Sequence, residues 1–115
     1  MSVTLNKVSR YIAYICPLCM QINTKSVNIF KISSSSPIEF LCSFDDCLEE
    51  CVYISRLKDK FKIEIECPVC GEIHIFKISS SGFLFKDLLT FKCPESNIDI
   101  FFVGDNENVK NAVLE

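Results

Sequence analysis

Eight cysteines stand among the 115 residues of the chain, and several fall in short, regularly spaced groups. The tetrapeptide CPLC occupies residues 16–19, and a near copy, CPVC, occupies residues 67–70. Cysteines at this spacing can bind a metal ion, form a redox-active dithiol or form disulfides. The surrounding sequence has to distinguish between these chemistries.

The start of the chain indicates a reducing environment. Its first residues, MSVTLNKVSRYIAYIC, lack the apolar core and small-residue cleavage site of a secretion signal. We therefore expect a cytoplasmic protein, in which clustered cysteines bind metal more often than they form disulfides. A disulfide framework is the alternative if the natural protein begins upstream. No apolar run approaches the length of about 18 residues that crosses a membrane.

The two halves of the sequence resemble each other. The step from Cys19 to Cys42 is 23 residues, and the step from Cys70 to Cys93 is also 23 residues. The hexapeptide FKISSS occurs once in each half as well. A fixed internal period indicates a repeated structural unit. We therefore predict a duplicated module.

Short segments typical of β-strands fill both halves. They are rich in β-branched and aromatic residues, and they read YIAYI, VNIFKI, CVYIS, KIEIE, IHIFKI and IDIFFV. The segment KIEIE alternates polar and apolar residues, which is the pattern of a half-buried strand. The predicted class is mostly β, with two antiparallel modules in tandem at residues 1–56 and 57–104.

A helix is expected only at the end of the chain. Asp105 is a suitable N-cap before NENVKNAV, which predicts a helix that starts near residue 106. Residues 105–115 would then be the beginning of a longer, truncated C-terminal helix. The serine runs at residues 33–36 and 79–81 are interpreted as polar hairpin loops.

The first half contains a complete set of metal ligands. Cys16 and Cys19 supply two thiolates from one turn, and Cys42 and Cys47 supply two more from the turn CSFDDC. Structural zinc takes four such ligands in a tetrahedron. The intervening 22 residues leave room for a pair of strands, so both turns can meet at one end of a sheet. We predict a Zn²⁺ ion held by these four cysteines.

This arrangement resembles the zinc-ribbon family, in which two cysteine-bearing hairpin knuckles hold one Zn²⁺ ion on a small antiparallel sheet. The resemblance rests on CPLC, CSFDDC and their flanking strands, and through the repeat it covers about residues 10–104. CSFDDC departs from the usual two-residue gap. Met20 stands where such knuckles usually have glycine, as Gly71 does in the second half, so the first knuckle must accept strain or a different turn.

The second half has only three matching ligands, Cys67, Cys70 and Cys93. We favour Cys51 as the fourth ligand, because a hairpin formed by CVYIS and FKIEIE would bring it beside the CPVC turn. The eight cysteines would then form two four-cysteine zinc sites. His74 is an alternative fourth ligand. A further alternative is that the second half binds no zinc and its cysteines are buried as small apolar residues.

No catalytic group is predicted. CPxC also occurs in glutaredoxin-like redox sites, where it starts a helix, but both motifs here lie between predicted strands. A four-cysteine zinc site has no open coordination position. The chain has only three glycines and no phosphate-binding loop, and Asp45 and Asp46 are interpreted as solvated turn residues. We expect a protein that is not an enzyme.

The composition favours a protein partner. The net charge is −3 and the pI is near 5.2, which argues against unspecific binding to a phosphate backbone. Ten phenylalanines in so small a β protein suggest a face covered by a partner or by a second copy. We therefore predict a zinc-binding structural or adaptor protein. The many Lys, Ile, Asn and Phe residues are typical of an AT-rich genome and suggest a bacterium.

The alternative function is nucleic-acid binding in transcription regulation. It would use the lysines around one predicted hairpin together with two lysines at equivalent repeat positions, namely Lys58, Lys60, Lys62, Lys31 and Lys77. Acidic residues that alternate along the same strand would weaken this basic group. For that reason nucleic-acid binding is the second choice.

Overall fold

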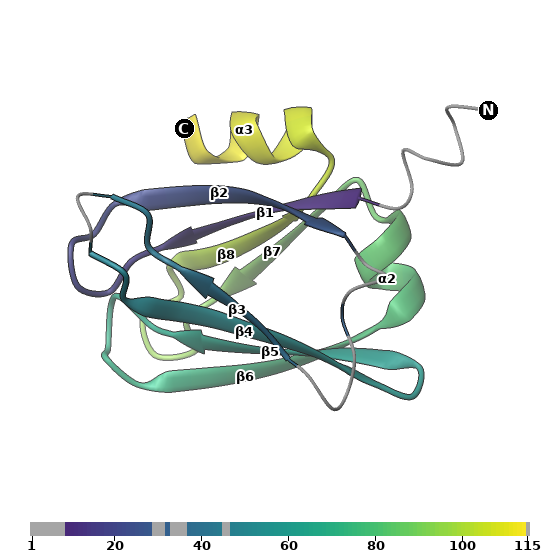
Figure 1. Cartoon of the computed structure of the whole chain (residues 1–115), viewed down its shortest axis with the longest axis horizontal. Helices are drawn as coiled ribbons and strands as arrows, with labels where there is room; N and C mark the ends of the chain where they lie inside the picture. Colours follow the sequence, from purple (N-terminus) through teal and green to yellow (C-terminus); the bar gives the residue numbers. More distant parts are fainter. Residues whose placement is uncertain (1–8, 29–31, 33–36, 45–46, 115) are drawn as a thin grey trace.

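The computed structural model describes residues 9–28, 32, 37–44 and 47–114 (Figure 1). In chain order, the elements within these ranges are β1 (Ser9–Ile15), β2 (Ile22–Asn28), β3 (Ile38–Leu41), β4 (Glu50–Leu57), β5 (Lys60–Glu66), β6 (Ile73–Ser79), α2 (Ser80–Phe85), β7 (Leu88–Lys92), β8 (Asp99–Gly104) and α3 (Asn106–Leu114). The predicted mostly β class with a C-terminal helix is confirmed.

The strands form two antiparallel sheets that pack face to face (Figure 1). Sheet A has the order β2-β1-β8-β7, and sheet B has the order β3-β4-β5-β6. Each sheet takes two strands from the first half of the chain and two from the second. Hydrogen bonding between strands therefore crosses the predicted module boundary at residues 56 and 57.

The two sheets have equivalent strand arrangements. Exchanging β1–β4 with β5–β8 converts the order of sheet A into that of sheet B. The central strand pairs also match, since Ile12 pairs with Val103 in sheet A and Ile63 pairs with Ile54 in sheet B. We expect this arrangement if the two halves, which have similar sequences, also have similar structures.

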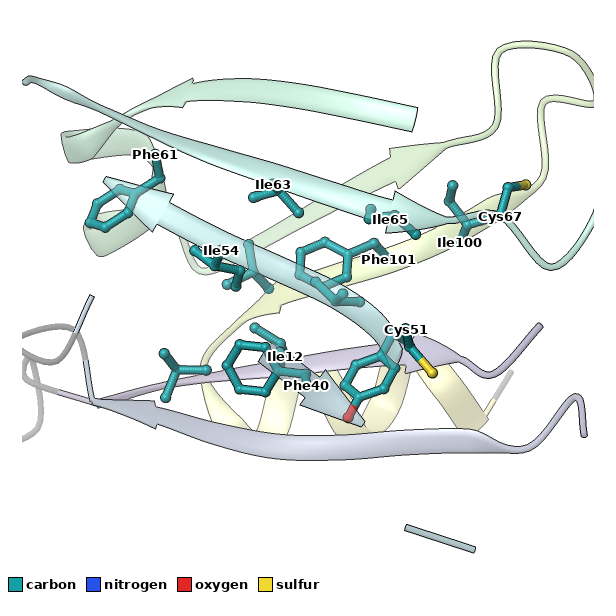
Figure 2. Close-up of a cluster of buried hydrophobic side chains, with 14 of the residues drawn as sticks. Ile12, Phe40, Cys51, Ile54, Phe61, Ile63, Ile65, Cys67, Ile100 and Phe101 are labelled. Atoms are coloured by element: carbon teal, nitrogen blue, oxygen red, sulfur yellow. The ribbon is translucent and has the colours of Figure 1, made fainter. Parts of the chain in front are cut away.

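The inner faces of both sheets contribute to one apolar core (Figure 2). On β5, Phe61, Ile63 and Ile65 are buried, while the residues between them face outward. This alternation is the one predicted for KIEIE, because successive side chains of a strand point to opposite faces. Sheet A supplies Ile12 and Phe101 to the same core.

Different structures close the two ends of the sandwich. The four cysteine-bearing turns lie at one end, on the left in Figure 1, and α2 lies at the other end. Phe83 of α2 is fully buried and stacks on Phe61, with ring centroids 4.5 Å apart.

Helix α2 corrects the interpretation of residues 79–81 as a hairpin loop. Ser80 and Ser81 begin the helix, and the side chain of Ser79 caps it by accepting a hydrogen bond from the Gly82 N–H. Phe83 supplies the burial that stabilises so short a helix. The other serine run, at residues 33–36, lies outside the described residues.

Helix α3 covers the outer face of sheet A, where it contacts β1 and β8 (Figure 1). It begins at Asn106, as predicted, and its Val109 side chain is buried. The Arg10 guanidinium pairs with Asp105 just before the helix, at 3.0 Å. No helix among the described residues is long and apolar enough to cross a membrane.

Candidate metal centres

The four cysteines predicted for the first half come together in the structure. Their sulfurs lie within 4.8 Å of one another, and all four are free thiols. The Sγ atoms of Cys16 and Cys47 are 3.7 Å apart, and those of Cys19 and Cys42 are 3.5 Å apart. Zn–S bonds of about 2.3 Å in a tetrahedron place sulfurs about 3.8 Å apart. The first cluster therefore has the dimensions of a zinc site.

The CPLC turn prepares Cys16 to bind a cation. The Cys16 N–H donates to the Gln21 carbonyl at 2.9 Å, and the Met20 N–H donates to the Cys16 carbonyl at 2.9 Å. The Cys16 sulfur accepts from the N–H groups of Leu18 at 3.4 Å and Cys19 at 3.5 Å. These hydrogen bonds fix the position of the Cys16 sulfur within the turn.

The CPVC turn has the same hydrogen bonds. The Gly71 N–H donates to the Cys67 carbonyl at 3.1 Å, and the Cys67 sulfur accepts from the N–H groups of Val69 at 3.3 Å and Cys70 at 3.5 Å. Gly71 has a φ of 79°, and Met20 has a φ of 63° at the equivalent place. The first knuckle thus keeps the usual turn and accepts a left-handed non-glycine residue.

The turn between β3 and β4 supplies the other two ligands of the first cluster. The Leu48 N–H closes it by donating to the Cys42 carbonyl at 3.1 Å, and Leu48 has a φ of 54°. Cys47 directly precedes this left-handed residue, just as Cys19 precedes Met20. Asp45 and Asp46, within this turn, lie outside the described residues.

The turn between β7 and β8 closes in the same way but lacks a second cysteine. The Asn97 N–H donates to the Cys93 carbonyl at 2.7 Å, and Asn97 has a φ of 63°. Ser96 directly precedes this left-handed residue and therefore occupies the place that Cys47 has in the first cluster. We call the place of Cys47 and Ser96 the knuckle position.

His74 completes the second cluster. Its side chain and the sulfurs of Cys67, Cys70 and Cys93 offer ligand atoms within 4.8 Å of one another. The His74 Nε2 atom is 3.2 Å from the Cys70 sulfur and 3.5 Å from the Cys93 sulfur. The Cys70 and Cys93 sulfurs are 4.0 Å apart. Three thiolates and one imidazole form a common zinc ligand set.

Cys51, the favoured fourth ligand from the sequence, does not lie in the second cluster. The predicted hairpin is present, since Val52 pairs with Ile65. However, the Cys51 thiol donates to the Glu49 carbonyl at 3.3 Å and lies in the core (Figure 2). Burial, and next the nearby Cys16, raise its pKa. Phe40 pairs with Val52 and the next residue, Leu41, pairs with Glu50, so Cys51 is the extra residue of a β-bulge. The bulge breaks the regular alternation of side chains, and Cys51 and Val52 are both buried.

A strand residue in the first cluster corresponds to His74. Asn23 on β2 and His74 on β6 each follow the second cysteine of a CPxC motif by four residues. Asn23 is 2% exposed, and its Oδ1 atom accepts from the N–H of Ser43 at 3.1 Å and from its hydroxyl at 3.3 Å. We call the place of Asn23 and His74 the strand position. Asn23 was not predicted from the sequence, although its spacing from Cys19 equals that of His74 from Cys70.

Ser96 influences the second cluster although it is not a ligand. Its hydroxyl is the largest cause that lowers the pKa of the Cys93 thiol to about 6, and His74 contributes in the same direction. The Ser96 Oγ atom is buried and makes no conventional hydrogen bond within the described part of the chain. A thiol with this pKa is largely ionised near neutral pH and is ready to bind metal.

Comparisons with protein-family models, with characterised proteins and with solved structures find no match. The protein can therefore be classified only by its fold and by the geometry of its two cysteine clusters. It is a two-sheet β protein with two cysteine-rich clusters that could hold metal ions.

Proposed function

We propose that this protein is a non-enzymatic zinc-binding structural or adaptor protein. Two Zn²⁺ ions would hold its sheets together, and the resulting rigid body would bind a protein partner or a second copy. One observation carries the proposal: each cluster takes ligands from both sheets. The first joins the β1–β2 turn of sheet A to the β3–β4 turn of sheet B, and the second joins the β5–β6 turn to the β7–β8 turn.

The donor atoms favour zinc over other common metals. Thiolate and imidazole ligands suit Zn²⁺, whereas Mg²⁺ and Ca²⁺ prefer oxygen ligands. Each cluster offers four ligand atoms, which would fill a tetrahedral shell. Catalytic zinc sites keep one position open for water or substrate. Closed shells therefore support a structural role.

The position of the clusters explains why metal would matter for folding. The sheets are joined through α2 and its Phe83 at one end, while the four turns at the other end carry exposed side chains. Metal binding in small domains contributes directly to folding, with about 10–16 kcal/mol measured for zinc-finger peptides. Two shared sites would hold the sheets together at the end that carries the four turns.

The surface supports a protein partner more than a nucleic acid. The four turns expose apolar side chains, namely Leu18, Met20, Phe44, Leu48, Val69 and Ile98. Such exposed apolar groups are typical of protein contact sites. Lys62, a member of the predicted basic group, lies 3.7 Å from Glu64, so its charge is partly offset. Lys31 of that group lies outside the described residues.

Metal analysis of the protein purified without added zinc tests this proposal. We expect two equivalents of zinc per chain. Removal with a strong chelator should abolish the cooperative unfolding transition, because the ligands would no longer link the sheets. The transition can be followed by circular dichroism. A metal-free protein that folds normally would contradict the proposal.

A further inference from the structure

The outer faces of the two sheets differ in what covers them. Helix α3 lies over sheet A, where Ala13 of β1 and Val109 of the helix are buried. No helix of the described part of the chain lies over the outer face of sheet B (Figure 1). The two sheets are otherwise equivalent in strand order. The outer face of sheet B therefore corresponds to the face of sheet A that α3 covers, but no helix of the described residues covers it.

Apolar side chains are exposed on this face. Ile73 is 66% exposed and Ile75 is 54% exposed, both on the edge strand β6. They pair with Glu66 and Glu64 of β5, respectively. The two isoleucines are neighbours on the same face of β6 and form a small apolar patch that a partner could cover.

One end of the face is acidic. A hollow of about 460 Å³ lies there, and its lining includes Tyr53, Ile73 and the four carboxylates of Glu49, Glu50, Glu64 and Glu66. A hydrogen bond with Glu49 is the largest cause that raises the pKa of Glu66, followed by burial and by Glu50. The crowded carboxylates would be stabilised by cations from outside the chain.

The other end of the face is basic. Along β5, Lys60 and Lys62 precede Glu64 and Glu66 and alternate with buried residues, so all four side chains point outward. Lys77 on β6 is exposed and pairs with Lys62. The charge order along β5 is therefore two positive residues followed by two negative ones.

We propose that a second copy of this chain packs against the outer face of sheet B with its strands reversed. The proposal rests on the function proposed above, since it specifies the partner. A twofold axis crossing β5 between Lys62 and Glu64 places Lys62 of one copy opposite Glu64 of the other. It also places Lys60 opposite Glu66. The same operation covers Ile75 with the aliphatic stem of Lys77 from the second copy.

The charge order favours a second copy over an unrelated partner. An isologous interface requires one patch to be complementary to itself, and this patch becomes so when the strand direction is reversed. A purely basic partner would match only the end that contains Glu64 and Glu66. Strands β4–β6 span roughly 20 by 15 Å, or about 300 Å². This area is smaller than the roughly 800 Å² that each partner typically buries in a stable interface. We therefore expect a dimer that dissociates on dilution.

Paired charge reversals provide the test, with sedimentation velocity over a range of concentrations as the readout. Glu64→Lys alone places like charges at the two symmetry-related contacts between residues 62 and 64, and so does Lys62→Glu alone, so each variant should be monomeric. An equimolar mixture of the two should restore a dimer, because every contact then joins opposite charges. The matched control is Glu107→Lys and Lys110→Glu on α3, each of which should dimerise like the parent.

Three results would overturn the proposed dimer: a parent protein that stays monomeric at high concentration, single variants that still dimerise, or a mixture that does not reassociate. Zinc content is measured in the same samples. A monomeric parent with two zinc equivalents overturns the dimer and leaves the zinc proposal standing. A parent without zinc overturns the proposed function whatever its oligomeric state.

Discussion

The two clusters are built on equivalent pairs of turns but place the fourth ligand differently. In the first cluster the knuckle position is Cys47 and the strand position is Asn23. In the second the knuckle position is Ser96 and the strand position is His74. An imidazole reaches farther from its backbone than a thiol does, so a more distant strand residue can supply a donor to the same place. The second cluster thus takes an imidazole from a strand where the first takes a thiol from a turn.

The polar residue at the remaining position, Asn23 in the first cluster and Ser96 in the second, also has a different role in each cluster. Asn23 accepts two hydrogen bonds from Ser43 next to Cys42. Ser96 instead lowers the pKa of Cys93. Each residue thus acts on or beside a cysteine of a cluster that could hold a metal ion, which is how groups that surround metal sites usually act.

The largest effect is expected from loss of a first-cluster ligand. Cys19→Ser should remove one zinc equivalent and destabilise the fold by more than about 4 kcal/mol, because loss of a structural metal is among the most costly changes. Metal analysis and chemical denaturation measure both quantities. Cys70→Ser is the matched variant of the second cluster. If both variants kept two equivalents of zinc, neither cluster would be a metal site.

The exchanged fourth ligand can be tested by transplanting it. His74→Asn should lose the second zinc equivalent, and the double variant His74→Asn with Ser96→Cys should recover it, because the knuckle position then carries a thiol as in the first cluster. Metal analysis after dialysis provides the measurement. Asn23→His combined with Cys47→Ser is the reciprocal control and should keep two equivalents. Full zinc content in His74→Asn alone would exclude His74 as a ligand.

A smaller effect is expected at Cys51, which is a core residue in the structure. Cys51→Ala should keep both zinc equivalents and lower the free energy of unfolding by about 1–2 kcal/mol, through lost burial and a small cavity. Urea denaturation with parallel metal analysis distinguishes the two roles. Loss of one zinc equivalent would restore Cys51 as a ligand, as the sequence had suggested.

The smallest effect concerns the two CPxC turns. Met20→Gly should stabilise the protein by about 1 kcal/mol, because glycine adopts the left-handed conformation without a Cβ penalty. Gly71→Ala should destabilise it by a similar amount. A Cβ at Gly71 would meet no atom within 4 Å, so backbone strain alone is measured there. If both variants unfolded at the same temperature as the parent protein, the proposed equivalence of the two turns would be contradicted.

Local patterns predicted much of the fold. Alternation identified β5, and the N-cap at Asp105 located the start of α3. The hairpin of β4 and β5 follows from two neighbouring segments and a tight turn between them. These features depend on residues close in sequence, which is why a single sequence carries them.

Features that depend on distant contacts were missed. The Ser79 N-cap is a weak local signal for α2, and the burial of Phe83 against Phe61, which stabilises the helix, cannot be read from the segment Ser79–Phe85 itself. Pairing of β1 with β8 joins the two ends of the chain and leaves no local pattern. The choice between Cys51 and His74 depended on side-chain direction, which a β-bulge in β4 changes at Cys51.

X-ray absorption at the zinc edge of the purified protein tests the central claim most directly. Two zinc ions, one bound by four thiolates and one by three thiolates and His74, predict an average of seven sulfur ligands to one nitrogen. The sulfurs should lie at about 2.3 Å and the nitrogen at about 2.0–2.1 Å. Two zinc equivalents with sulfur ligands alone, or a single zinc per chain, would contradict the claim that the clusters are two sites with exchanged fourth ligands.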